Sequence, residues 1–188
     1  MGMTFALLAL TDEGSLDLTR PALPEAADAV IGALFPRTPY RRAGEGALGG
    51  AGIPPRQEPW VGVFDGGALL ATRDAFLYDP RILHARYLRF EAWPDVHLIA
   101  SQSSTNMFAY GRWRDGELVR SVSVNPVAGV RNVTGVRQDF EVPEVRVDTW
   151  LDAANATLAA VLGLTGDTAT PVPGGAGWDE VHLQRYAR

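Results

Sequence analysis

The stretch MFAYGRWRDGELVRSVSVN, residues 107–125, constrains the fold of this chain more than any other segment. Two runs in which apolar and polar residues alternate flank the pair Asp115-Gly116. An Asp-Gly pair between such runs is typical of a two-residue type I′ turn, because both central residues of that turn adopt a positive φ. The sequence therefore predicts a β-hairpin whose register is fixed by its turn. This register pairs Gly111 with Arg120.

The predicted register gives the hairpin two different faces, because opposed residues of an antiparallel pair share a face. One face is apolar and holds Met107, Ala109, Gly111, Trp113, Leu118, Val122 and Val124. Arg120 is the exception on this apolar face, where it lies opposite Gly111. The other face mixes aromatic, hydroxyl and charged side chains, among them Tyr110, Arg112, Ser121 and Ser123.

A buried arginine needs a partner for its charge, and two hypotheses supply one for Arg120. In the first, the guanidinium pairs with a carboxylate inside the protein, for which Glu141 is the candidate. In the second, the planar guanidinium binds the carboxylate or phosphate of a small anionic ligand above Gly111. We favour the internal pair, because structural ion pairs also occupy such positions.

Composition excludes several classes of function. The chain has 188 residues, a net charge of −5 and no long basic run, which argues against nucleic acid as a partner. It has no cysteine, so disulfides and thiolate metal sites are excluded. No stretch approaches the roughly 18 apolar residues that span a membrane. The N-terminal MGMTFALLAL has no basic region and no cleavage signal, so we expect a cytoplasmic protein.

The remaining patterns predict an α+β fold. Thr4–Thr11 is a continuous apolar run, which is typical of a strand buried on both faces. Pro24 can open a helix at its first position, and apolar residues then recur at helical spacing up to Leu34. A second hairpin is expected at residues 60–73, with a turn at Asp65-Gly66-Gly67.

The C-terminal half predicts another helix and three more strands. Asp148 is expected to cap a helix that begins at Thr149 and ends at Gly163. Further strands are expected at residues 96–100, 136–142 and 181–187, and the strand at 136–142 is predicted to lie at an edge of the sheet.

Two segments lack any periodicity: the long Gly/Pro-rich loop 36–59 and the flexible segment 165–177. No linker divides the chain, so we expect a single domain over residues 1–188. In this domain, a mostly antiparallel sheet of two hairpins plus the N-terminal strand packs against two main helices.

Three motifs that would indicate a known chemistry fail on their context. Gly44–Gly49 matches G-x-G-x-x-G, but no strand precedes it and prolines follow it, so a dinucleotide site is rejected. The histidines are too scattered for a zinc site, and we expect no metal and no cofactor. Ser101–Ser104 follow a strand that contains His97, but they lack the G-x-S-x-G elbow of a hydrolase. These serines are therefore predicted to stabilise a turn.

The functional prediction rests on the polar hairpin face. A solvated or helix-covered sheet face is the simpler explanation of these aromatic, arginine and hydroxyl groups, but they also suit a ligand or partner surface, and we carry this second hypothesis. The predicted binding residues are Tyr110, Arg112, Arg120, Ser121, Ser123 and Ser103. We favour a non-enzymatic protein that binds an unknown protein partner or a small anionic ligand. The alternative is a small hydrolase or transferase with a site near Ser101–Ser104 and the 36–59 loop as its lid.

Three sequence motifs resemble a known family. They are WVGVFDG at residues 60–66, FAYxxWxDGxLxRSxS at 108–123, and FExP at 140–143. Together they resemble an uncharacterised actinobacterial domain-of-unknown-function family, from the first strand to about Pro143. The resemblance implies a cytoplasmic protein of actinobacterial type. It implies no known activity, so it assigns no catalytic residue.

Overall fold

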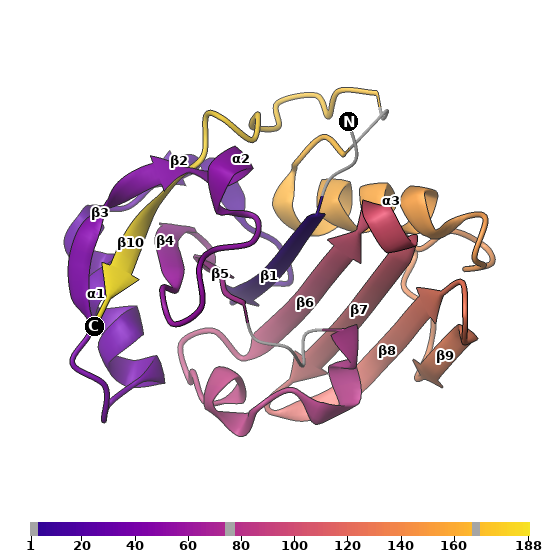
Figure 1. Ribbon diagram of the computed structural model, residues 1–188, viewed down its shortest axis with the longest axis horizontal. Helices are drawn as coiled ribbons and strands as arrows, with labels where there is room; N and C mark the ends of the chain where they lie inside the picture. The colour runs from indigo at the N-terminus through magenta and orange to yellow at the C-terminus, as the bar shows by residue number, and fades with distance from the viewer. Residues whose placement is uncertain (1–3, 74–77, 167–169) are drawn as a thin grey trace.

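The computed structural model describes residues 4–73, 78–166 and 170–188 (Figure 1). The strands are β1 (Thr4–Thr11), β2 (Asp17–Pro21), β3 (Arg41–Ala47), β4 (Trp60–Asp65), β5 (Gly67–Ala71), β6 (Asp95–Gln102), β7 (Met107–Arg114), β8 (Glu117–Asn125), β9 (Gly129–Thr134) and β10 (His182–Ala187). The helices are α1 (Pro24–Leu34), α2 (Leu48–Ala51) and α3 (Trp150–Leu162), with the 3₁₀ helices η2 (Pro80–Ile82), η3 (Ala85–Leu88) and η4 (Ser103–Thr105).

The strands form one ten-stranded sheet in the order β3-β10-β4-β5-β1-β6-β7-β8-β9, with β2 paired to β4. All of its recorded pairings are antiparallel. The predicted α+β fold with a mostly antiparallel sheet is therefore confirmed. Both predicted hairpins are present, as β4–β5 and β7–β8, but the sheet is larger than two hairpins and one strand. No described helix is long and apolar enough to cross a membrane.

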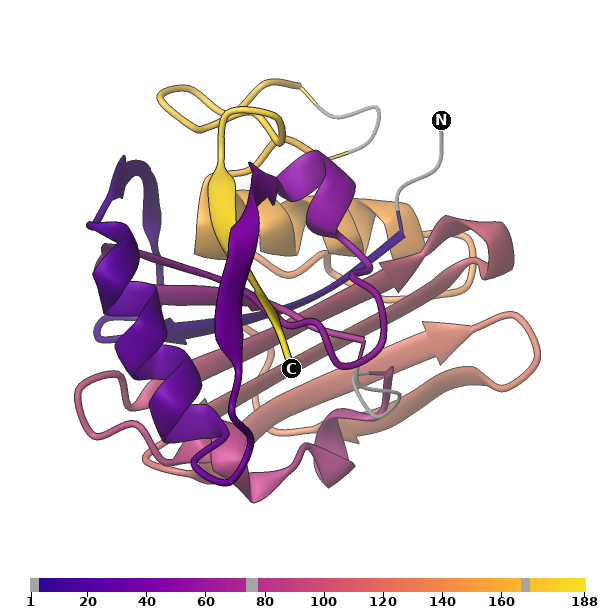
Figure 2. The ribbon, with the colours of Figure 1, turned by 60° about the vertical axis from the view of Figure 1, so that its left-hand side comes forward.

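β1 is buried on both faces, as its unbroken apolar run predicts. Leu7 enters a core cluster that contains Leu158 of α3, whereas Leu8 enters a second cluster that contains Ile31 of α1. α3 contacts β6 and β7, and α1 contacts β4. In Figure 2, α1 and the β3–β10 edge come forward while α3 lies behind them. The two faces of the sheet are thus covered by different helices.

The predicted turn of the β7–β8 hairpin is confirmed, but the predicted register is wrong beyond its first two pairs. Asp115 and Gly116 adopt positive φ values of 52° and 81°, as a type I′ turn requires. The register then shifts, because Val119 is an extra residue that pairs with no residue of β7. As a result, Arg112 pairs with Arg120. Such a β-bulge turns the following residues of its strand to the other face.

The bulge places the residues of β8 that follow it on the face opposite to the predicted one. Val122 and Val124, which were predicted to share a face with Ala109, instead lie in the core beneath α3. Ser121 and Ser123 turn to the opposite face, so the predicted cluster that joined them to Tyr110 is wrong. The physical reason is that this arrangement pairs Arg120 with Glu141 and hydrogen-bonds the serine hydroxyls to β9, while the two valines remain buried.

Three other predictions are corrected. The 36–59 loop contains β3 and α2, and β3 was missed because its exposed residues show no alternation of polarity. The edge strand is β9, whereas residues 136–142 run over the sheet without pairing. α3 begins at Trp150, one residue later than predicted; its N-cap is Thr149, and Asp148 instead forms an ion pair with Arg146.

The predicted flexible segment 165–177 includes residues 167–169, which lie outside the described residues. The rest of that segment forms no helix or strand.

The close contact of β5 with β1 gives a test of the fold. Gly67 has a φ of 152°, and a Cβ atom there would lie 1.9 Å from the carbonyl oxygen of Leu10. Gly67→Ala should therefore lower the free energy of unfolding by about 3 kcal/mol or more, measured in urea. Gly32→Ala in α1 is the matched control, because a Cβ atom there meets nothing within 4 Å. It should stabilise the protein by about 0.5–1 kcal/mol, and equal effects of the two changes would contradict this assignment.

Candidate functional site

A cavity opens where β1 extends past the end of β5. The pairing of β5 with β1 ends at Leu7, opposite Ala71. At the next residue, the amide of Ala6 donates to the carbonyl of Gly52 at 3.0 Å, and its carbonyl accepts from the amide of Thr72 at 3.4 Å. Two segments outside the sheet thus form the hydrogen bonds of the Ala6 backbone on this side. The space between these segments, above the Ala6 side chain, is the cavity.

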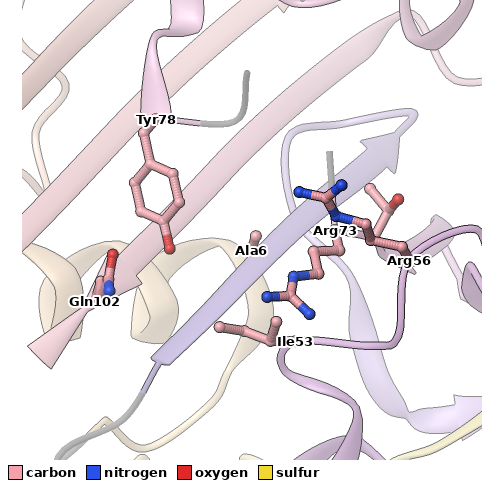
Figure 3. Close-up of a pocket in the computed structure, with 7 residues that line it drawn as sticks. Ala6, Ile53, Arg56, Arg73, Tyr78 and Gln102 are labelled. Atoms are coloured by element: carbon pink, nitrogen blue, oxygen red, sulfur yellow. The ribbon is translucent and has the colours of Figure 1, made fainter. Parts of the chain in front are cut away.

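The cavity has a volume of about 230 Å³ and is lined by Ala6, Ile53, Arg56, Thr72, Arg73, Tyr78 and Gln102. The lining comes from five parts of the chain: β1, the segment after α2, the segment before residue 74, the segment after residue 77, and the end of β6. Figure 3 shows Tyr78 and Gln102 on one side of β1 and the two arginines on the other. The tyrosine hydroxyl points toward the centre of this group.

The charged groups of the cavity are both cations. Within the part of the chain that the structure describes, neither Arg56 nor Arg73 forms an ion pair or a hydrogen bond, and the lining contains no acidic residue. Both side chains are exposed. A guanidinium presents its donors in a planar fork that matches the oxygens of carboxylate or phosphate. This end of the cavity therefore presents two guanidinium groups that could bind an anion.

Neutral polar groups face the two arginines. The hydroxyl of Tyr78 donates a long hydrogen bond of 3.5 Å to the carbonyl of Ser101. Burial raises the pKa of Tyr78, so its hydroxyl keeps its proton and stays a donor at neutral pH. The amide nitrogen of Gln102 lies 3.4 Å from the hydroxyl of Ser104. The cavity thus combines two cations with neutral donors and an apolar side formed by Ile53.

A second polar cluster is buried under loop 12–15 at the other end of the sheet. Arg112 donates to both carboxylate oxygens of Asp95, at 2.9 and 2.5 Å, and Arg114 donates to one of them at 3.0 Å. Burial alone would raise the pKa of Asp95, but the hydrogen bonds that Arg112 donates outweigh it and hold that pKa well below its usual range. Asp95 is therefore an anion enclosed by cations.

His97 lies inside this cluster and is neutral. Its Nδ1 is 3.2 Å from the hydroxyl of Tyr110. Its Nε2 is 3.3 Å from an oxygen of Asp95 but lacks the geometry of a hydrogen bond. Burial lowers the pKa of His97, and the approach of Asp95 only partly offsets this effect. The cluster is enclosed, since a Cβ atom on Gly14 would already contact Asp95 and Arg112.

Arg120 forms the internal ion pair that the sequence predicted. Its Nε and Nη2 donate to Glu141 at 2.9 and 2.6 Å, and its Nη1 donates to the carbonyls of Thr134 and Gly135 at 3.2 and 3.4 Å. Both side chains of the pair are buried. The pairing with Glu141 is thus confirmed, and each nitrogen of the guanidinium already has a protein partner.

The other predicted site residues are divided between separate places. Tyr110 and Arg112 lie beside Arg120 in the buried cluster. Ser121 donates to the carbonyl of Asn132, and Ser123 accepts from the amide of Asn132 at 2.9 Å, so both serines attach β9 to β8.

The Ser101–Ser104 region touches the cavity through Gln102 alone. Ser101 is buried on the opposite face of β6, and Ser103 lies in η4 outside the cavity lining. The 36–59 segment does contribute to the cavity, through Ile53 and Arg56. Sequence reasoning missed the arginines and Tyr78. The available signal was the pair of prolines before Arg56, which fixes a turn but does not show what the turn approaches.

A model of a family of unknown function, DUF6928, matches residues 5–145. The chain belongs to DUF6928. The predicted resemblance to a family of unknown function is confirmed, whereas an actinobacterial origin stays an expectation. All residues that line the cavity fall within the matched range, whereas α3 and β10 lie outside it. No curated protein and no solved structure matches the chain.

The Arg120–Glu141 pair can be tested by unfolding in urea. Arg120→Met leaves the Glu141 carboxylate buried without its cation, so it should lower the free energy of unfolding by about 3–5 kcal/mol. Arg20→Met removes the exposed partner of Asp65 and should cost less than about 1 kcal/mol. The double change Arg120→Met with Glu141→Leu should recover part of the loss. Unchanged stability of Arg120→Met would contradict a structural role.

His97 predicts a specific pH dependence of stability. Because the folded pKa of His97 is lowered, the unfolded chain binds a proton below about pH 6.5 that the folded chain does not. The stability that depends on His97 should be complete above that pH and decrease on acidification toward the folded pKa. Asp95 has a lowered folded pKa, so its contribution to stability is complete above about pH 4 and is lost only below that pH.

The variant His97→Gln should flatten the dependence of unfolding free energy on pH between about 6.5 and 5, measured by urea titration. Tyr110→Phe is the control, because it removes the hydrogen bond to His97 but leaves the imidazole buried. Equal slopes for the wild type and His97→Gln would show that His97 is not the group responsible.

Proposed function

We propose that this protein binds a small anionic ligand in the cavity above Ala6 and does not catalyse a reaction on it. The observation that carries the proposal is the convergence of Arg56 and Arg73 on one cavity whose described lining has no carboxylate. Both guanidinium groups line the same cavity, and an anion bound there would compensate their positive charge. The position of the site differs from the hairpin face that the sequence favoured.

The neutral groups support binding by supplying orientation. Thr72, Tyr78 and Gln102 place hydroxyl and amide groups around the same space, and a few such groups typically orient a ligand in an otherwise apolar pocket. A volume of about 230 Å³ suits a small molecule. The two charges come from segments separated in the chain, so the site exists only in the folded protein.

The composition of the lining favours binding over hydrolysis. Its hydroxyl groups belong to Thr72 and Tyr78, and no histidine or carboxylate among the described lining residues stands ready to activate them. The predicted alternative, a hydrolase that uses Ser101–Ser104, has its serines outside the cavity. A site with two cations and no base holds an anion without attacking it.

The proposal is tested by thermal unfolding in the presence of inorganic phosphate, acetate and benzoate. A ligand that binds only the folded state raises Tm with its concentration, and at least one of these anions should do so in a saturable manner. Arg56→Gln and Arg73→Gln should each weaken that binding about tenfold or more, because each removes a charge-assisted hydrogen bond.

Arg89→Gln is the matched control, since Arg89 is exposed and lies outside the cavity lining. It should leave binding unchanged. Saturable binding that persists at full strength in both Arg56→Gln and Arg73→Gln, or no binding of any anion, would overturn the proposal.

A further inference from the structure

We infer that the ligand of the cavity is a phosphate monoester that carries a small aromatic or apolar group. This inference rests on the proposed function and specifies its ligand class. It follows from two properties of the lining: the amount of unpaired positive charge at one end and the apolar surface beside it.

The charge of the cavity favours a dianion. Arg56 and Arg73 contribute two positive charges, and no acidic residue in the described lining offsets either of them. A carboxylate carries one negative charge and would leave one guanidinium uncompensated. A phosphate monoester has a second pKa of about 6, so it carries nearly two negative charges at neutral pH, and it presents three acceptor oxygens. These oxygens can accept from both forks at once.

The apolar part of the lining favours an ester over inorganic phosphate. Ile53 is 39% exposed at the cavity, although an isoleucine is normally buried. The ring of Tyr78 forms the facing side, and the methyl group of Ala6 forms the floor (Figure 3). Inorganic phosphate would leave this surface in contact with water. A ring or short chain attached to the phosphate would cover it and gain the free energy of apolar burial.

The size and the neutral groups limit the ester group. The cavity, at about 230 Å³, is smaller than the roughly 300–1,000 Å³ of pockets for drug-sized ligands. One ring beside the phosphate therefore suits it better than a long chain. Gln102 and the hydroxyl of Tyr78 lie across β1 from the arginines, so they are placed to contact the ester group (Figure 3). Such a group occurs in small free molecules and in phosphorylated tyrosine side chains.

The test compares four probes on the full chain by isothermal titration calorimetry: phenyl phosphate, inorganic phosphate, benzoate and a short phosphotyrosine peptide. Phenyl phosphate should bind at least about tenfold more tightly than benzoate, because it compensates both guanidinium groups. It should also bind more tightly than inorganic phosphate. Its affinity should fall as the pH is lowered through about 6, where the phosphate takes up its second proton.

Three variants assign these effects to the cavity. Arg56→Gln and Arg73→Gln should each weaken phenyl phosphate and inorganic phosphate alike. Ile53→Ser changes an exposed side chain, so it should fold normally and weaken phenyl phosphate several-fold while leaving inorganic phosphate unchanged. Arg89→Gln should change neither affinity.

The outcomes separate this inference from the proposed function. Benzoate or inorganic phosphate could bind as tightly as phenyl phosphate, with the affinities for that probe and for phenyl phosphate both lost in Arg73→Gln. This result would overturn the phosphate monoester as the ligand but leave the anion site intact. No binding of any probe would overturn both. Phenyl phosphate binding that survives Arg56→Gln, Arg73→Gln and Ile53→Ser would place it elsewhere and overturn both as well. Tighter binding of the peptide supports the inference with a phosphorylated protein as source, and weaker binding supports it with a free molecule.

Discussion

β1 is the element on which the rest of the structure depends, because both of its edges and both of its faces are occupied. β5 and β6 pair with its two edges, and its side chains alternate between the core beneath α3 and the core beneath α1. Its C-terminal end is held by the bond from Thr11 to the carbonyl of Asp95. Its N-terminal end extends past the end of β5, and the cavity forms there. One strand therefore organises the core and supplies the floor of the candidate site.

Interactions of buried arginines hold one segment against the sheet where no strand pairing does so. The irregular segment after β9 has no partner strand, yet it is held against the sheet by Glu141 on Arg120 and by Gln138 on Arg112. The ring of Phe140 meets that of Tyr110 edge-on at 5.7 Å between centroids. Buried charges cost desolvation, and these are tolerated because their hydrogen bonds are satisfied. The bulge in β8 makes this possible, since it turns Arg120 toward the segment.

Local signals in the sequence predict more of this fold than long-range contacts do. The Asp115-Gly116 turn and both main helices were predictable because their causes lie within a few residues. The internal pairing of Arg120 was predictable because a buried charge requires a partner. The extra residue Val119 was not, since a bulge is selected by packing on both faces of the sheet and leaves no local mark. Arg56 and Gln102 line one cavity because β1 pairs with β6 on one edge and bonds to Gly52 on the other, and no spacing in the sequence encodes this arrangement.

The floor of the cavity is a single methyl group. Ala6 is 5% exposed and belongs to the core as well as to the cavity, so the size of its side chain sets the depth of the cavity. The two arginines approach from other segments and do not depend on the identity of this side chain. A substitution by valine or leucine at this one strand position would make the cavity shallower while every polar group stayed in place. Within such an architecture, the depth of the cavity can change independently of the charge of its lining.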